Sequence, residues 1–479
     1  MNYKQCLNEM YALRRFGIKL GLETIQHILL KLGNPHDKFD TIHVAGTNGK
    51  GSVCAMLANL LQIHGFRVGL YTSPHLVHFN ERIVINGTPI DNKQVVNLYQ
   101  KVKKVQKPDR ELTFFEYTTA MAFCAFAEQN VDIAVIETGM GGRLDATNVL
   151  MPRLSIITNI GLEHQAYLGR KIENIAFEKA GIIKPGVPVI TDVQNKTAFE
   201  VIFDTAKQKC APVYQLGKRI NVRLRKDSFS YSGLKFEWIR LNCALNGYHQ
   251  IRNAGMALCA YECFTGNKAN WKTVNKALRT VNWPGRVEVI SKKPLVILDG
   301  AHNTMAMQHL TKYLKNIVKN RSLTLIVSVL NDKPYDIMLN KLIKLASSVV
   351  VTQAKIDRSI APEILRDFIK EKVQDVKIIP NVSDAYFETV RNADESDIIC
   401  ATGSLYVVGE VKAAINDNSS EIFLALRIHC AELVFTQYAY GNLYARTKNS
   451  MKPMSKINVR ANLIFALRTK TGIKTMFEN

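Results

Sequence analysis

Short apolar runs rich in β-branched residues alternate with longer stretches of helical periodicity along most of the chain. Nearly continuous apolar runs of this length are typical of parallel strands that are buried on both faces of a sheet. In the first half they cover residues 41–46, 66–72, 132–139, 154–160 and 187–192. After the first run, apolar residues recur at helical spacing from Val53 to Leu61, which predicts a helix that ends near Gly65.

The pattern changes between about residues 210 and 240. Apolar and polar residues alternate there, as in INVRLRKDSFSYSGLKFEWIRL, which predicts antiparallel strands in a small added sheet. A helical stretch from roughly 250 to 280 follows. The Pro284–Gly285 pair then predicts a turn that could link two domains.

A second series of strands and helices begins after this turn. Its apolar runs are PLVILDGAHN, LTLIVSVL, SSVVVTQ, VKIIPN and DIICATGS. The sequence therefore predicts an α/β protein with a mainly parallel first sheet, a small antiparallel sheet and a smaller Rossmann-like second domain. We place the domains at residues 1–290 and 291–418. A basic tail of unknown role follows at 419–479 and lacks this rhythm.

Composition narrows the class of protein. The 479 residues are 47% hydrophobic and 22% charged, which is the balance of a globular protein. No apolar run approaches the ~20 residues that span a bilayer. The first residues carry charges where a signal peptide needs an apolar stretch, so we expect a cytoplasmic protein. The nine cysteines are scattered without a CxxC pair, as expected of reduced thiols.

The net charge of +22 could attract nucleic acid, an anionic membrane or acidic small molecules. The basic residues form no single block, so the charge does not choose among these partners.

The segment VAGTNGKGS (44–52) follows the first predicted strand and leads into a helix. Glycines in such a turn let backbone amides surround phosphate oxygens, while the helix adds its positive end. Lys50 could reach the β- and γ-phosphates and Ser52 could bind Mg²⁺. A purely structural turn is the alternative. The order of strand, glycines, lysine, hydroxyl and helix favours a nucleotide site.

Other candidate residues are less specific taken singly. Glu137 ends a predicted strand in IETGMGGRLDATN, where its carboxylate could meet the nucleotide's Mg²⁺. Asp299 ends the first strand of the second domain, where ligands of doubly wound sheets gather. An ordinary strand end is the alternative for each, but the phosphate loop upstream favours the metal role for Glu137. Ser73, His164 and Lys179 would not be selected on spacing alone.

Together these segments resemble the folylpolyglutamate synthase and dihydrofolate synthase family of the Mur ligase superfamily. The resemblance runs in order from about residue 16 to 412. It rests on FGIKLGLETI, HVAGTNGKGSV, YTSPHLVHFNERI, TFFEYTTAMAF, IETGMGGRLDATN, EKAGIIK, WPGRVEV, LDGAHN and GSLYVVGEV.

The resemblance implies an ATP-dependent ligase with ATP bound between two domains. ATP would phosphorylate a carboxylate of a folate or dihydropteroate, and the amine of L-glutamate would then displace phosphate. It further implies Mg²⁺, with two ions expected. We expect a monomer that binds neither nucleic acid nor membrane.

The resemblance also assigns roles to individual residues. Lys50, His164 and a carbamylated Lys179 would act in catalysis. The nucleotide would be bound by Gly49, Lys50, Gly51, Ser52, Asn253, Arg286, Asp299 and His302. The metal ligands would be Ser73, Glu137 and His164. The acceptor would be bound by Leu20, Gly21, Leu22, Thr113, Phe114, Phe115, Glu116, Leu144, Asp145 and Ala146.

The chain departs from the family at two positions: Glu163 stands where aspartate is usual, and Thr304 where proline is common. One alternative is another Mur-type ligase that acts on a cell-wall precursor. Such enzymes carry a nucleotide-sugar domain before the phosphate loop, and only about 45 residues precede it here. A basic P-loop protein that binds nucleic acid is the alternative of a different class.

Overall fold

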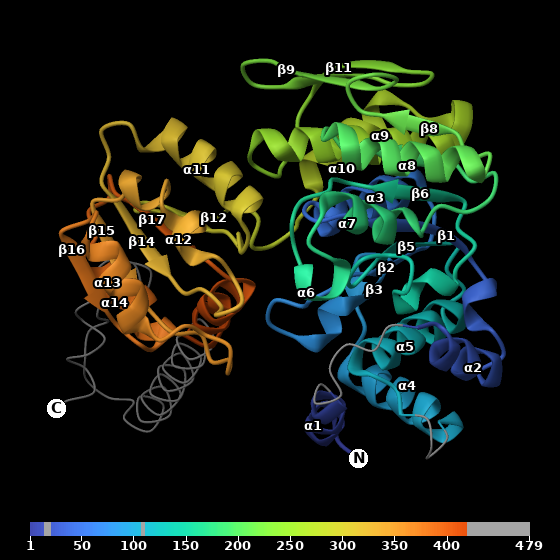
Figure 1. Cartoon of the computed structure of the whole chain (residues 1–479), viewed down its shortest axis with the longest axis horizontal. Coiled ribbons are helices and arrows are strands. Elements are labelled where there is room, and N and C mark those ends of the chain that lie inside the picture. The colour runs from blue at the N-terminus through green and yellow to red at the C-terminus, as the bar shows by residue number, and fades with distance from the viewer. Residues whose placement is uncertain (14–20, 107–110, 419–479) are drawn as a thin grey trace, which may run out of the picture. The chain divides into compact units, whose positions relative to one another are not determined.

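The computed structural model describes residues 1–13, 21–106 and 111–418. Residues Met1–Ala414 form one compact unit that contains two large sheets, each flanked by helices (Figure 1). The predicted tail at 419–479 and the candidate Leu20 lie outside the described residues.

The first sheet has eight strands in the order β4-β3-β2-β5-β1-β6-β7-β8. Pairing is parallel from β2 through β8, and β3 and β4 add an antiparallel edge. The strands are β1 (Asp40–Ala45), β2 (Val68–Tyr71), β3 (Ile83–Ile85), β4 (Thr88–Pro89), β5 (Ile133–Glu137), β6 (Leu154–Ile157), β7 (Val189–Thr191) and β8 (Val213–Gln215). The five apolar runs of the first half are therefore strands, as predicted.

Helices flank this sheet. They are α1 (Tyr3–Ala12), α2 (Glu23–Lys31), α3 (Lys50–His64), α4 (Asn92–Val105), α5 (Phe114–Glu128), α6 (Gln165–Leu168), α7 (Ile172–Ala180), α8 (Lys196–Gln208), α9 (Tyr248–Thr265) and α10 (Trp271–Thr280). Helix α3 ends where predicted, because Gly65 takes a left-handed φ of 116° as its cap. The predicted helical stretch from about 250 to 280 consists of two helices, α9 and α10, with a short 3-10 turn at Gly266–Lys268 between them.

Alternate side chains of the first sheet enter different cores. Ile42 and Val44 of β1 pack with residues of α3, α9 and α10. Ile136 of β5 points to the other side and packs with residues of α1, α2, α4 and α5. Ala45 joins a core that is shared with α7 and α8. Because both faces are covered, the strands carry the continuous apolar runs seen in the sequence.

The alternating segment forms a three-stranded antiparallel sheet, as predicted. Its strands are β9 (Asn221–Leu224), β10 (Phe229–Ser232) and β11 (Glu237–Leu241). The prediction began about ten residues too early, because β8 pairs in parallel with β7 and belongs to the first sheet.

The second large sheet has the order β12-β13-β17-β14-β15-β16, and β12 is its only antiparallel strand among the described residues. Its strands are β12 (Glu288–Lys292), β13 (Leu295–Leu298), β14 (Leu323–Val327), β15 (Ser348–Val351), β16 (Asp375–Ile378) and β17 (Ile398–Thr402). Its helices are α11 (Thr304–Val318), α12 (Tyr335–Leu339), α13 (Pro362–Lys370) and α14 (Val382–Arg391). Strand β12 takes residues from both sides of position 290, and residues 405–418 are helical.

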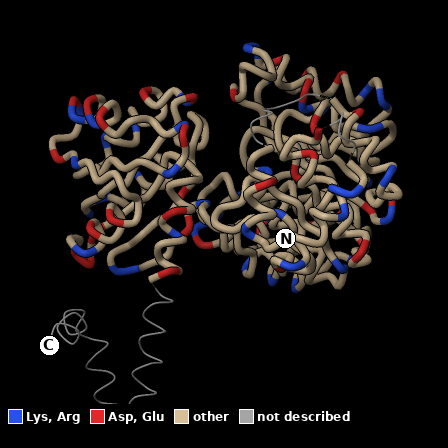
Figure 2. The backbone as a smooth tube through the Cα atoms, turned by 90° about the horizontal axis from the view of Figure 1, so that it is seen from below, with Lys and Arg blue, Asp and Glu red and all other residues tan. Residues whose placement is uncertain are grey.

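Charge is dispersed over the described backbone. Segments with Lys or Arg alternate with segments that carry Asp or Glu in the view of Figure 2. The cysteines of the described part are all free thiols. Among the helices in those same residues, none combines the length and hydrophobicity that a bilayer-spanning segment needs.

Candidate active site

The turn between β1 and α3 has the backbone geometry of an anion-binding loop. Gly46 and Gly49 have φ values of 149° and 86°, which side-chain-bearing residues rarely adopt. A Cβ atom on Gly49 would also lie only 2.7 Å from Asn253 Oδ1. Helix α3 starts directly after this turn, so its free N-terminal amides and positive dipole end are available to a phosphate.

Two lysines converge on the carbonyl oxygen of Gly46. Lys50 Nζ donates to it at 3.0 Å and also to Thr47 O at 3.3 Å, while Lys179 Nζ donates at 2.8 Å from α7. Lys179 is buried, and its burial together with the charge of Lys50 lowers its pKa to about 7. The site therefore holds one lysine whose amine is neutral in about half of the molecules near pH 7.

Ser73 and Glu137 meet at the carboxyl ends of the neighbouring strands β2 and β5. The Ser73 amide donates to Glu137 Oε2 at 3.2 Å, and Lys50 Nζ lies 4.0 Å from Glu137 Oε1. Burial raises the pKa of Glu137, although the Lys50 charge opposes this effect. A buried carboxylate beside Ser73 and the phosphate loop fits Mg²⁺, which takes few protein ligands together with phosphate oxygens.

Protein donors alone do not form a complete metal centre in the described part of the chain. No group of three or more His, Cys, Asp and Glu side chains gathers there around a common point. The predicted ligands Ser73 and Glu137 therefore suit an ion that phosphate oxygens help to hold.

Glu163 is the centre of a second polar cluster, on the loop after β6. Its Oε1 lies 3.5 Å from His302 Nε2 and 3.9 Å from His164 Nε2, and it accepts from Asn303 Nδ2 at 3.3 Å. Burial by itself would raise the pKa of Glu163, but the hydrogen bond and charge of His302 hold it well below the ordinary range. Burial lowers the pKa of His164 to about 4, so its imidazole is neutral near pH 7, as metal ligation requires.

The same cluster reaches the phosphate loop. Asn303 and Asn48 exchange two amide hydrogen bonds, of 2.9 and 3.2 Å. Asn303 Oδ1 also accepts from Ala306 N at 2.9 Å, which caps the first turn of α11. Thr304 is the first residue of that helix, so the departure from proline falls where proline is merely favourable.

Asp299 and Arg286 lie together at the start of the second sheet. The buried Asp299 carboxylate accepts from Val287 N at 2.8 Å and from Ala301 N at 2.9 Å. Burial raises its pKa and the charge of Arg286 lowers it. Its oxygens thus already hold two backbone amides, so the carboxylate shapes the turn around Arg286.

The predicted acceptor segments border one hydrophobic core, since Ala146 belongs to it and Leu22, Phe114 and Phe115 pack against it. Phe115 lies against Gly139, because a Cβ atom on that glycine would come within 2.6 Å of the ring. Thr113 and Glu116, in contrast, bond to each other as an N-terminal capping box of α5. Leu22 packs on the core formed with α5, and Gly21 precedes it with a φ of 147°.

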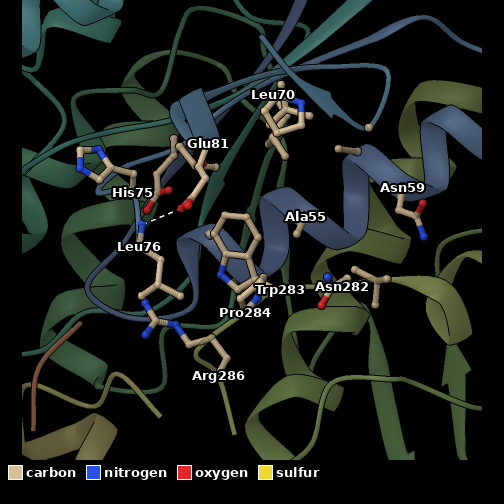
Figure 3. A pocket seen from close by; sticks show the side chains of 18 of the residues that line it. Ala55, Asn59, Leu70, His75, Leu76, Glu81, Asn282, Trp283, Pro284 and Arg286 are labelled. Atoms are coloured by element: carbon tan, nitrogen blue, oxygen red, sulfur yellow. Dashed lines mark hydrogen bonds between the residues drawn. The ribbon is translucent and has the colours of Figure 1, made fainter. Parts of the chain in front are cut away.

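A cavity of about 460 Å³ lies beside the phosphate loop (Figure 3). It is lined by Gly51 and Ala55 of α3, by Ser73 and Glu137, and by Trp283 and Arg286, among others. At one end of the cavity, the Glu81 carboxylate accepts a hydrogen bond from the Leu76 amide at 2.7 Å. This bond shapes the loop between β2 and β3. The indole of Trp283 faces α3, and a Cβ atom on Gly51 would come within 2.6 Å of it.

The structure thus brings Gly49, Lys50, Ser73, Glu137 and Lys179 to one edge of the first sheet. It brings His164 and His302 to Glu163. Sequence reasoning missed the roles of Asn48, Trp283 and Asn303. All three stand in quoted motifs, but a single sequence gives no signal for contacts between segments that far apart.

A Mur-type ligase is the class of protein that this fold and this site define. The Mur ligase middle domain matches residues 44–261, and the Mur ligase glutamate ligase domain matches residues 285–405. The dihydrofolate synthase/folylpolyglutamate synthase of Bacillus subtilis is 35% identical over 426 residues, which are 86% of this chain and 98% of that protein. The chain belongs to the folylpolyglutamate synthase and dihydrofolate synthase family, and it is an ATP-dependent carboxylate–amine ligase.

Solved structures agree with this assignment. E. coli FolC in complex with DHPP and ADP has a TM-score of 0.82 and 28% identity, with 88% of this chain and 99% of that one covered. A bifunctional folylpolyglutamate synthase/dihydrofolate synthase with Mn, AMPPNP and L-glutamate bound has a TM-score of 0.78 and 27% identity, with 87% of this chain and 98% of that one covered.

Proposed function

We propose that the chain joins L-glutamate to the carboxylate of a folate or of dihydropteroate, using ATP. The observation that carries this proposal is the meeting of Lys50, Lys179, Ser73 and Glu137 around the phosphate loop. The ligands of the relatives point the same way, since E. coli FolC binds DHPP and ADP, and a bifunctional folylpolyglutamate synthase/dihydrofolate synthase binds L-glutamate and AMPPNP.

The reaction proceeds in two displacements. An acceptor carboxylate oxygen attacks the γ-phosphorus of ATP, ADP leaves, and an acyl phosphate forms. The glutamate amine then attacks the acyl carbon, and inorganic phosphate leaves with the bridging oxygen as the amide bond forms. Phosphoryl transfer depends mainly on positioning and charge neutralisation. Lys50 supplies a positive charge at the phosphates, and the turn amides orient them.

Two Mg²⁺ ions fit the polar groups of the site. Ser73 and Glu137 would hold one ion, and His164 would hold the other with Glu163 nearby. When bound, such ions neutralise phosphate charge and polarise the carbonyl group that is attacked. The Mn ion bound with AMPPNP in the bifunctional synthase of Yersinia pestis supports a divalent ion at this kind of site.

Lys179 is suited to carbamylation. A neutral amine is needed for attack on CO₂, and the pKa of about 7 makes that form available. The product is a carboxylate-like group. It would exchange a buried cation next to Lys50 for an anion, which removes the repulsion between the two lysines and adds an oxygen ligand for a metal or substrate.

The remaining assignments concern the nucleotide and the acceptor. We place the nucleotide against Gly49, Gly51, Ser52, Asn253, Arg286, Asp299 and His302. We place the acceptor along residues 20–22, 113–116 and 144–146. We expect the active species to be a monomer.

A coupled assay tests the proposal. Purified protein with ATP, Mg²⁺ and L-glutamate should release ADP only when dihydropteroate or tetrahydrofolate is also present, and comparison of the two identifies the acceptor. Lys50→Ala should lower turnover by about 10²- to 10³-fold, as for other lost transition-state contacts. Lys196→Ala, on an exposed part of α8 with its side chain 91% accessible, is the matched control and should keep full activity. No ADP release with either acceptor would refute the function.

A further inference from the structure

A buried histidine sits three residues before the phosphate-binding turn, and the ligase chemistry does not use it. His43 of β1 is fully buried between Ile136 of β5 and Ser155 of β6. Its Nε2 lies 2.7 Å from the hydroxyl oxygen of Thr147. Its Nδ1 is buried and has no hydrogen-bond partner in the described residues.

The direction of the hydrogen bonds follows from the number of protons. Thr147 Oγ1 donates its one proton to Asp145 Oδ1 at 2.5 Å. It must therefore accept from His43, which places the imidazole proton on Nε2. Burial lowers the pKa of His43 to about 3, so the ring is neutral and carries only that proton near pH 7. The hydrogen bonds are therefore donated in one direction, from His43 to Thr147 and from Thr147 to Asp145.

Asp145 is the point where this chain acts on the backbone. Its Oδ2 accepts from Met140 N at 2.9 Å, and its Oδ1 also accepts from Thr147 N at 3.0 Å. Residues 138–145 form the loop that leaves β5 after Glu137. The loop then runs past Phe115 at Gly139 and meets α7, where Arg143 N donates to Glu178 O at 2.7 Å. Asp145 thus fixes both ends of a loop that borders the acceptor segments.

Stability alone does not explain the choice of histidine. Ile136 and Ala45, which lie on the same side of the sheet, are apolar. An apolar side chain of similar size at position 43 would avoid burying an unpaired Nδ1, which is unfavourable. The one hydrogen bond that the ring makes among the described residues is the bond from Nε2 to Thr147.

We propose that His43 is a positioning residue that orients Asp145 through Thr147 and so holds residues 139–146 in the shape that receives the acceptor. The inference rests on the proposed function, in which residues 144–146 contact the folate or dihydropteroate. Glu137 itself is held in the β5 ladder opposite Val44, so its place beside Lys50 does not depend on this chain.

Thr147→Val and Thr147→Ser form a matched pair for the test, since valine keeps the shape and serine keeps the hydroxyl. Thr147→Val should raise the KM for the acceptor by about tenfold, as expected when a hydrogen bond to a charged group is lost, and leave the KM for ATP within about twofold. Thr147→Ser should restore the wild-type value. His43→Leu should match Thr147→Val, and the double variant should be no worse than either, because both break one chain.

Amide hydrogen exchange over residues 137–146 provides a second readout that does not depend on turnover. Exchange should be faster in Thr147→Val than in wild type and should return to normal in Thr147→Ser. Unchanged exchange in Thr147→Val would overturn the proposal, as would faster exchange with an unchanged acceptor KM. Equal changes in both KM values and kcat would overturn it too, because they indicate a purely structural role. Absence of ligation by the wild type would refute the proposed function. The exchange data would still test whether the hydrogen bonds from His43 through Thr147 to Asp145 hold the loop.

Discussion

At the scale of single residues, the glycine between Lys50 and Ser52 has a steric explanation. Alanine would be the better helix former at the second position of α3. The indole of Trp283 leaves no room for it, because a Cβ atom would lie 2.6 Å from Cζ2. Glycine therefore lets Trp283 pack against the first turn of the helix that carries Lys50.

Gly51→Ala should weaken ADP binding, because either the indole or the phosphate loop must move. Overpacking of this kind costs about 1–3 kcal/mol, so we expect a loss of affinity of about tenfold or more by calorimetry. Gly51→Ala/Trp283→Leu should recover most of it by opening the space. Wild-type affinity in the single variant would show that this contact does not shape the loop.

Lys179 makes a pH-dependent contribution to stability whose sign is fixed by its pKa. The value is about 7 in the folded protein and returns to about 10.5 on unfolding. Between these values the unfolded state binds one more proton, so stability falls as pH decreases from about 10.5 to about 7 and changes no further below.

Lys179→Met should therefore be more stable than wild type by a margin that grows as pH is lowered from about 10 to about 7. Urea midpoints of both proteins in CO₂-free buffer measure the margin. Profiles that stay parallel across this range would contradict a depressed pKa for this lysine.

At the scale of elements, the cap of α11 does two things. Asn303 stabilises the first turn of the helix and also pairs with Asn48 of the phosphate loop. Asn381 caps α14 with the same side chain, accepting from Ser383 N and Asp384 N. Both asparagines therefore cap a helix, but of the two only Asn303 also contacts the phosphate loop.

Asn303→Ala and Asn381→Ala should each lower the free energy of unfolding by about 1 kcal/mol through the lost cap. Only Asn303→Ala should also raise the KM for ATP, since of these two asparagines only Asn303 contacts the phosphate loop. Equal kinetic effects of the two substitutions would argue against this coupling.

The strands of the first sheet were the elements best predicted from the sequence. Continuous apolar runs marked β1, β2, β5, β6 and β7, because a strand buried on both faces leaves no other pattern. The short strand β8 was missed, since three half-buried residues carry little periodicity. At the site, the local order of glycines, lysine and serine was enough to predict the phosphate-binding turn at residues 46–52. The pairs Asn48–Asn303 and Trp283–Gly51 were not, because they depend on packing across more than 200 residues.

At the scale of the whole molecule, the described residues of the site all precede the tail. Among the residues that the structure describes, those that line the cavity beside the phosphate loop end at Leu405. The helical residues 405–418 follow. The proposed chemistry uses no residue of 419–479.

A chain that ends at residue 418 should accordingly keep wild-type kcat and KM values. Steady-state kinetics of the truncated and full-length proteins, each checked for monodispersity, make the comparison. Loss of activity in a folded, monodisperse truncated protein would assign the tail a part in catalysis.

The fate of the acceptor's carboxylate oxygen tests the central claim most directly. The acceptor is labelled with oxygen-18 in the reacting carboxylate and incubated with ATP, Mg²⁺ and L-glutamate. Amide formation through an acyl phosphate predicts one labelled oxygen in the released phosphate and one in the product amide. Retention of both labelled oxygens in the acceptor, or phosphate that carries no label, would contradict the account.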